Sequence, residues 1–571
     1  MAKMKMLICA VMIVMLTVGC SNNNANTPTA KPTATAKSQE NAQENSPQED
    51  VRLEPITFTI STSDEKLDWD APVTNELTAR TGVSLEYDVI VGDQFQKWDL
   101  WLAGGDYPDI VVLDTAHVQK YADAGAVIPL NDLIDQYGAN IKEKFGEFYN
   151  LLKDKDGNIY SLYNVNRAEE APADSAASFV IQMDVLKEAG YPEIRTFEQL
   201  YELIKNYKEK HPQIDGQETL GYSAAMNGWT VNIEFNNPII SALGLPDHGN
   251  FRIDDANNVT YNPVTDEAKQ YYQFLNKLYN EGLLDKESFS LDYDGIRTKM
   301  AQGRVLAAYA PAWFVTEPNS LLKSEGKYNR MYAHIPIYFD GVTEDRSHSL
   351  TPTGAGSFQW AITKTAKNPE RIIQFIDYLF SDEGQILTHW GIEGVHYDVV
   401  DGKRVINKEL EQNRINDPLI NYAEGFYSPE GSQINWFTLG NGAKLGDGDY
   451  ATHLTKDSIV ENYDEETKAL LAAYNKQTWA DFLPEAQYVP GYLWQLTPPE
   501  EAAVQIQKIE DTWKRMLPKI ILSKNNDEFE KEWNEMVSII KNDGLLEMEA
   551  SYTRVWKEFI DKYNETINNQ K

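Results

Sequence analysis

The chain has 571 residues, of which 42% are hydrophobic, and its formal net charge is -35. Single hydrophobic cores stop growing at about 250–300 residues, so this length predicts a soluble globular protein with two or three domain-sized units. The negative charge repels phosphate backbones and anionic headgroups, which argues against nucleic acid as a partner and against a polybasic membrane patch.

The first residues have the pattern of a signal peptide. Lys3 and Lys5 precede an apolar run over residues 6–18, which is too short to span a membrane as a helix. Residues 16–20, with the sequence LTVGC, resemble the lipobox of bacterial lipoproteins. This resemblance implies that residues 1–19 are removed and that Cys20 carries a diacylglycerol. An ordinary secretory peptide with an incidental cysteine is the alternative.

Residues 20–50 are expected to form a lipidated cysteine followed by a disordered tether. The stretch after Cys20 is built of Asn, Thr, Ala, Pro, Gln and Glu, so it cannot bury enough apolar surface to offset the entropy of ordering. Two acyl chains hold a protein on a membrane stably, so such an anchor needs no spanning helix. The only other cysteine, Cys9, lies in the signal peptide, and the mature chain can therefore form no internal disulfide.

The folded part opens with strands that alternate with helices. Residues 56–60 and 83–89 alternate apolar and polar side chains with the period of a strand, and residues 110–113 form a third, continuous apolar strand. Between the last two strands, Phe95, Trp98 and Leu102 recur at helical spacing. This order predicts a parallel sheet with helical crossovers and therefore an α/β protein.

Local signals further along predict where helices and turns begin. Thr196 and Gln199 form a capping box, Thr265 is expected to cap the next helix, and Pro369 is expected to begin another. Residues 305–309 have the pattern of a strand and residues 401–402 that of a hairpin turn. From residue 498 onward the pattern is helical only. Three tryptophans on helical stripes are assigned to packing: Trp98, Trp533 and Trp556.

Signatures of catalysis are missing from the sequence. The eight histidines include no His-x-x-x-His pair, and neither a Gly-x-Ser-x-Gly elbow nor a Walker-type phosphate loop occurs. With 87 acidic residues, some carboxylate pair will stand at glycosidase separation in any fold, so that criterion neither supports nor excludes hydrolysis. Residues 154–158 are interpreted as a tight turn rather than a calcium loop, and residues 292–295 also lack the pattern of a calcium loop. We therefore expect no enzyme, no cofactor and no bound metal.

The chain is rich in aromatic side chains. It contains 13 Trp, 31 Tyr and 20 Phe, and such rings stack on the apolar faces of sugars while polar side chains bind the hydroxyls. Trp229, Trp313 and Trp436 each lie beside Gly, Asn or Pro in a loop-like context, where binding residues are commonly carried. A core position and a ligand site both stay open for these three.

Several stretches carry a resemblance to a known family. They are GDYPDI at 105–110, GAVIPLN at 125–131, DGNIY at 156–160, EGLLD at 281–285, SDEG at 381–384 and GIEGVHY at 391–397. In their order and spacing, the chain resembles bacterial extracellular solute-binding proteins of family 1, especially the large lipoprotein branch associated with polysaccharide-utilisation importers. The resemblance implies a two-lobe, periplasmic-binding-protein-like fold of type II, with hinge-linked α/β lobes, a ligand cleft and extra C-terminal helices.

The resemblance also implies where the lobes and the ligand lie. Lobe one is expected at residues 51–175 plus 362–405, and lobe two at residues 176–361 plus 406–571. This branch often has a calcium loop after the helix that ends near residue 212; here the segment is shortened to residues 213–218, which leaves open whether a calcium ion is bound. Cleft residues come from loops after strands, although Asp114 could equally cap a helix. The expected ligand-binding residues are Thr62, Ser63, Asp64, Asp114, Trp229, Trp313 and Trp436.

The function implied is the uptake of a carbohydrate. We expect the substrate-binding lipoprotein of an ABC importer, a monomer on the extracellular face of the cell membrane. It would bind an oligosaccharide by hinge closure and pass it to the permease subunits. One alternative is a tethered extracellular glycan-degrading enzyme, a lyase or a glycosidase. Another is a binding protein that captures peptides or serves a membrane sensor.

Overall fold

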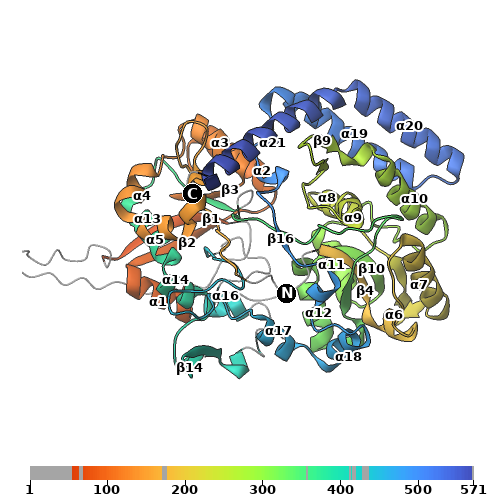
Figure 1. Cartoon of the computed structure of the whole chain (residues 1–571), viewed down its shortest axis with the longest axis horizontal. Coiled ribbons are helices and arrows are strands. Elements are labelled where there is room, and N and C mark those ends of the chain that lie inside the picture. Colours follow the sequence, from red (N-terminus) through yellow and green to blue (C-terminus); the bar gives the residue numbers. More distant parts are fainter. Residues whose placement is uncertain are drawn as a thin grey trace, which may run out of the picture. The chain divides into compact units, whose positions relative to one another are not determined.

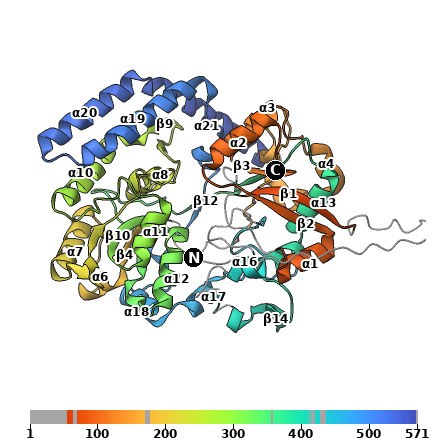
Figure 2. The same cartoon turned by 180° about the vertical axis from the view of Figure 1, so that it is seen from behind.

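The computed structural model describes residues 54–62, 69–169, 177–354, 358–410, 413, 420–426 and 436–568. Cys20, the tether, Ser63 and Asp64 lie outside these residues. Figures 1 and 2 show two groups of elements, each built around its own sheet, with the strand segments β12 (Ser349–Leu350) and β16 (Gln487–Tyr488) running between them. Both groups combine helices with a mixed sheet, and the predicted α/β class is confirmed.

The first sheet has the strand order β13-β3-β1-β2. Strands β1 (Ile56–Thr62), β2 (Val83–Val89) and β3 (Ile110–Leu113) are parallel, which confirms the prediction from their alternation with helices. Helix α1 (Pro72–Thr81) connects β1 to β2, and α2 (Gln94–Gly104) connects β2 to β3. The fourth strand, β13 (Gln359–Ile362), returns from much later in the chain and pairs antiparallel with β3.

Helices and a β-hairpin accompany this sheet. Pro369 begins α13 as predicted, and Asn368 before it adopts a left-handed conformation with φ 54°. The hairpin β14 (Tyr397–Val400) and β15 (Lys403–Ile406) turns through Asp401 and Gly402, both with positive φ, which also confirms a prediction. The helices are α3 (Thr115–Asp123), α4 (Asn131–Tyr137), α5 (Ala139–Phe145), α13 (Pro369–Phe380) and α14 (Asp382–His389).

The second sheet has the strand order β11-β4-β10-β7. Its central strand β10 (Val305–Pro311) is buried along its whole length, pairs parallel with β7 (Leu220–Tyr222) and pairs antiparallel with β4 (Ala177–Gln182). Strand β11 (Tyr332–Ile335) completes the sheet on the other side of β4. A strand that is buried on both faces has a continuous run of apolar residues, and residues 305–309 have this pattern in the sequence.

Helices flank the second sheet in the predicted order. Helix α7 (Phe197–Lys210) begins with the capping box of Thr196 and Gln199, and α10 (Asp266–Asn280) begins at Thr265, so both predicted caps are confirmed. The remaining helices that bear on the site are α8 (Thr230–Phe235), α9 (Asn237–Ala242), α11 (Tyr293–Ala301) and α12 (Ala312–Ser324).

Three long helices end the chain: α19 (Ala503–Ile521), α20 (Asn526–Asn542) and α21 (Leu545–Asn568). Figure 1 shows them in blue, beside α10 and β9 (Val259–Tyr261). Trp533 and Trp556 are buried in the core of the second group and Trp98 in a cluster of the first, which confirms that these tryptophans are packing residues. Helix α21 also reaches the first group, because Lys562 donates to the carbonyl of Leu151 at 3.3 Å.

The sheets and hydrophobic cores place segments in the first group that the expected boundaries assign to lobe two. Strand β13 belongs to the first sheet, whereas the expected boundary placed residues 359–361 in lobe two. Residues 436–451 also pack in the first core, since Trp436 contacts Phe375 and Phe437 stacks on Phe380. We keep two lobes as a proposal and move these two segments to lobe one.

Candidate functional site

Three aromatic rings form an exposed cluster, here called the aromatic triad: Trp229, Tyr293 and Trp313. The ring centroids of Trp229 and Tyr293 are 5.2 Å apart, and Trp313 lies 6.0 Å from each of them. Trp229 is 48% exposed and Trp313 is 37% exposed, so two large apolar faces are in contact with solvent. Trp229 and Trp313, two of the expected ligand-binding residues, are thus brought together.

Secondary structure explains why the triad lies where it does. Trp313 is the second residue of α12, directly after β10, and Trp229 stands at the start of α8 in the segment that follows β7. Because β7 and β10 are parallel, the segments that follow them leave the same edge of the sheet. Tyr293 is the first residue of α11. Ligands of α/β proteins bind beyond the carboxyl ends of the strands, which is the position of this triad.

A charged pair rims the triad. Arg297 lies one turn after Tyr293 and places its guanidinium 4.5 Å from the centre of the Tyr293 ring. Glu317 lies one turn after Trp313 and forms an ion pair with Arg297. The Nε of Arg297 is buried and has no hydrogen-bond partner among the described residues. The combination of flat apolar faces and polar groups at their rim suits a ligand that has both apolar faces and hydroxyls.

The first sheet contributes a second set of expected residues at its carboxyl edge. Thr62 ends β1 and Asp114 follows β3, and these strands are parallel. The Asp114 carboxylate caps α3, accepting from the backbone N–H of His117 at 2.7 Å, and it also contacts the His117 ring at 2.8 Å. The capping role weighed for Asp114 is therefore real, and its side chain remains 27% exposed. A ligand role for Thr62 and Asp114 stays a proposal.

Trp436 requires a correction, because its ring is not available to a ligand. It is fully buried, its indole N–H donates to the carbonyl of Gly425 at 3.2 Å, and its ring packs edge-on against Trp69 at 6.0 Å. The neighbouring Asn and Gly residues made the segment look like a surface loop, but the segment folds into the core of the first group. We remove Trp436 from the candidate site.

Tyr293 of the triad, Arg297 beside it and the exposed Trp494 are not identified by the sequence analysis. Tyr293 lies within residues 292–295, which the sequence analysis weighs only against a calcium loop, and Arg297 lies two residues after this stretch. Their i, i+4 spacing at a helix start was the available signal. Trp494, which is 45% exposed, lies in the short 3₁₀ helix η6 (Leu493–Gln495). Its neighbours in the sequence gave no pattern that separates it from core tryptophans.

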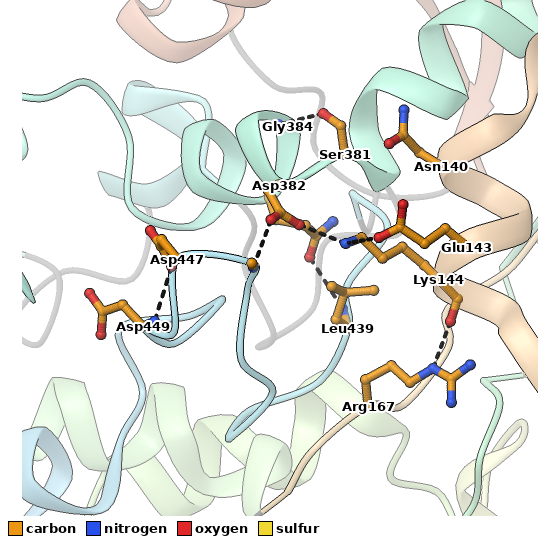
Figure 3. A network of polar contacts seen from close by, with 12 residues as sticks. Asn140, Glu143, Lys144, Arg167, Ser381, Asp382, Gly384, Leu439, Asp447 and Asp449 are labelled. Atoms are coloured by element: carbon orange, nitrogen blue, oxygen red, sulfur yellow. Dashed lines mark hydrogen bonds and ion pairs between the residues drawn. The ribbon is translucent and has the colours of Figure 1, made fainter.

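The SDEG stretch at residues 381–384 is structural (Figure 3). Ser381 caps α14 by accepting from the N–H of Gly384 at 3.0 Å, and Asp382 binds both the Lys144 ammonium at 2.6 Å and the N–H of Gly446 at 2.7 Å. Burial alone would lower the pKa of Lys144, but its hydrogen bonds to Asp382 and Glu143 outweigh this effect and raise the pKa. A cavity of about 640 Å³ adjoins this network. The polar groups of the network already bond one another, so we do not assign them a ligand.

Residues 154–158 form a tight turn, as predicted, whereas residues 292–295 are the start of helix α11. The Asp154 carboxylate accepts from the N–H groups of Asp156 and Asn158, and Asp292 caps α11 through the N–H of Gly295. Residues 213–218 form a two-stranded hairpin, which turns at residues 215–216. Within the described ranges, no group of three or more His, Cys, Asp or Glu side chains is placed to hold a metal ion.

The sequence matches the family described as bacterial extracellular solute-binding protein over residues 61–386, more than half of the chain. It is 24% identical to the fructooligosaccharide ABC transporter substrate-binding protein FusA of Streptococcus pneumoniae over 60% of this chain and 66% of that protein. It is also 24% identical to the polygalacturonan/rhamnogalacturonan-binding protein YtcQ of Bacillus subtilis over 54% of this chain and 60% of that protein. The chain thus matches just under two thirds of the length of FusA and less of YtcQ.

Two solved structures resemble this one over most of both chains. FusA of S. pneumoniae in complex with kestose superposes with a TM-score of 0.61 at 18% identity, covering 89% of this chain and 100% of the other. A solute-binding protein of Bifidobacterium longum infantis, described as HMO binding, superposes with a TM-score of 0.62 at 15% identity, covering 89% and 99%. At these identities the likeness shows the fold.

Proposed function

The chain belongs to the bacterial extracellular solute-binding protein family and has the type II fold expected from its sequence, and from this we propose that it is the carbohydrate-binding lipoprotein of an ABC importer. The observation that carries the proposal is the exposed aromatic triad at the carboxyl edge of the second sheet. Exposed indoles in mutual contact offer the surface on which a sugar ring stacks, and Arg297 and Glu317 lie where hydroxyls would be bound.

The names of the relatives support the sugar class and leave the individual sugar open. FusA is described as binding fructooligosaccharides and YtcQ as binding polygalacturonan and rhamnogalacturonan, which are chemically different chains. What these ligands share is length, since each is built of several sugar units. We therefore propose an oligosaccharide as the ligand of this chain.

Binding is proposed to act through closure of the two lobes. Tyr293 of the triad packs against the second core, and Trp313 directly precedes Phe314, a buried member of that core, whereas Thr62 ends β1 and Asp114 follows β3 of the first sheet. A ligand that contacts both halves only in the closed form binds that form more tightly, and this difference in affinity is what shifts the equilibrium towards closure. The closed, liganded form is the one we expect the permease subunits to recognise.

Attachment to the extracellular face of the cell membrane is proposed to occur through lipid on Cys20. No helix in the described part of the chain is both long and apolar enough to cross a bilayer. Replacing Cys20 with Ala should release the protein from membranes into the medium, because a diacyl anchor would no longer form. A variant that stays in the membrane fraction after a high-salt wash would show that the attachment has another source.

The function is tested with a panel of oligosaccharides of defined composition, read by thermal shift and then by titration calorimetry. We expect at least one sugar to raise the melting temperature, because a ligand that binds only the folded state stabilises that state. We expect no sugar to be cleaved, either by hydrolysis or by a lyase reaction. Product formation in the same tubes would favour the tethered glycan-degrading enzyme. Stabilisation by peptides, with no response to any sugar, would refute the carbohydrate assignment.

A further inference from the structure

Trp494 shares the exposure of the triad residues but lies in a different segment of the chain. It is 45% exposed, whereas four other tryptophans of the C-terminal region are buried: Trp479, Trp513, Trp533 and Trp556. A single exposed apolar residue is normal on a protein surface and proves nothing by itself. What sets Trp494 apart is how firmly its exposed ring is held.

Three contacts fix the Trp494 ring. Its indole N–H donates to the carbonyl oxygen of Asp247 at 3.0 Å, and its ring stacks on Tyr492 with centroids 5.6 Å apart and planes 15° from parallel. Tyr492 is itself fixed, since its hydroxyl donates to the carbonyl of Ser349 at 2.8 Å. Gly249, which has a φ of +72°, lies next to Trp494: a Cβ atom added at Gly249 would be 3.4 Å from the Trp494 Cβ. Because the ring is already immobilised, stacking a ligand on it costs little further conformational entropy.

The segment of Trp494 bridges the two halves of the candidate site. Its neighbour Gln495 accepts a hydrogen bond from the Thr115 hydroxyl at 2.9 Å, directly beside Asp114 of the first half. On the other side, Asp247 accepts from the Asn237 amide at 3.0 Å. Asn237 begins α9, which follows the short helix α8 that starts at Trp229. Trp494 therefore lies between the carboxyl edge of the first sheet and the segment that carries the triad.

Polar groups suited to sugar hydroxyls occur around this ring. The side-chain carbonyl oxygens of Asn237 and Asn250 have no hydrogen-bond partner among the described residues, but both atoms are closed off from solvent and are therefore not assigned to a ligand. On the side of Tyr492, a pocket of about 250 Å³ is lined by Asn164, Asn166 and Ser349, among others.

We propose that Trp494, supported by Tyr492, is a second stacking platform of the sugar site. The ligand is then an oligosaccharide that extends from the aromatic triad along the crossing segment to η6. This inference rests on the proposed function and adds to it a dependence of affinity on ligand length and the residue that causes it.

The test compares ligand lengths in matched variants by titration calorimetry. The probes are fructo-, cello- and galacturono-oligosaccharides, each from the disaccharide to the hexasaccharide. For the series that binds, Trp494→Ala should weaken binding of the longer members about tenfold and leave the shortest binding member unchanged. Trp494→Tyr should restore most of the loss, because it keeps a stacking ring. Trp229→Ala should weaken all members. Leu546→Ala, at a 74% exposed residue of α21, is the surface control and should change none.

The outcomes separate the inference from the function on which it rests. If Trp229→Ala weakens binding while the Trp494→Ala variant binds oligosaccharides of every length with unchanged affinity, Trp494 is not a second platform. The sugar-binding function then still stands. Equal weakening of all lengths by Trp494→Ala, with a lowered melting temperature, would show that the residue acts through folding and would also overturn the inference. If the unaltered protein binds none of the three series, the proposed function fails for these sugars and the inference fails with it.

Discussion

Removing either exposed indole of the triad should weaken ligand binding. The loss cannot exceed the free energy gained by covering the area that the indole exposes to solvent. A tryptophan side chain offers at most about 250 Å², so 48% exposure leaves about 120 Å² on Trp229 and 37% leaves about 90 Å² on Trp313. At about 25 cal/mol per Å², full coverage would stabilise the complex by about 3 and about 2 kcal/mol. A sugar that stacks on one face covers about half of this area, so we expect Trp229→Ala to lose about 1.5 kcal/mol and Trp313→Ala about 1 kcal/mol.

The assay is titration calorimetry with the sugar that stabilises the unaltered protein most, alongside chemical denaturation of each variant. The free energy of unfolding should fall by less than it does for a fully buried tryptophan, because 48% of Trp229 and 37% of Trp313 are already in contact with water. Trp533→Ala is the control, since it removes a ring that is 5% exposed and should lower stability while affinity at the site is kept. Unchanged affinity in both triad variants, together with a collapse of their melting temperatures, would show that the two rings are core residues and refute the site.

Other predictions follow from packing and burial. Trp436→Ala should lower the free energy of unfolding by about 3–5 kcal/mol in urea denaturation, since it empties a fully buried site and leaves the Gly425 carbonyl unpaired. Gly384→Ala should destabilise by more than about 1 kcal/mol, because a Cβ there would overlap the Tyr378 carbonyl. Burial lowers the pKa of His334 to about 4, so the unfolded chain binds more protons between about pH 6.5 and 4. Stability should be full above pH 6.5 and fall as the pH drops through this window, and His334→Gln should flatten the fall. Exhaustive chelation should leave sugar affinity unchanged, as no described side-chain cluster suits a metal; loss that calcium restores would contradict this.

The parts of the fold that local chemistry decides could be predicted from the sequence. A capping box needs only the hydroxyl of Thr196 and the amide of Gln199 three residues later, and the structure contains both hydrogen bonds. The parallel arrangement of β1, β2 and β3 could be predicted from the periodicity, because parallel neighbouring strands need a long crossover connection and the sequence between these strands has the pattern of a helix. By contrast, the place of β13 in the first sheet depends on pairing across more than two hundred residues, and no local pattern encodes that partner.

The same limit explains which site residues the sequence could identify. Trp313 and Trp436 both follow turn-forming neighbours, so they look alike in sequence, but one ring stays 37% exposed and the other is fully buried. The difference arises from what each ring meets. Trp313 sits at the end of a strand, where the sheet edge leaves its face open, whereas Trp436 meets Trp69 and Phe375, which come from segments far away in the chain. Exposure of an aromatic ring is thus a property of the assembled core, and a binding platform can be told from a packing residue only once its distant neighbours are known. In this chain, Trp436 is therefore a core residue, and Trp494 is the residue whose replacement is most informative.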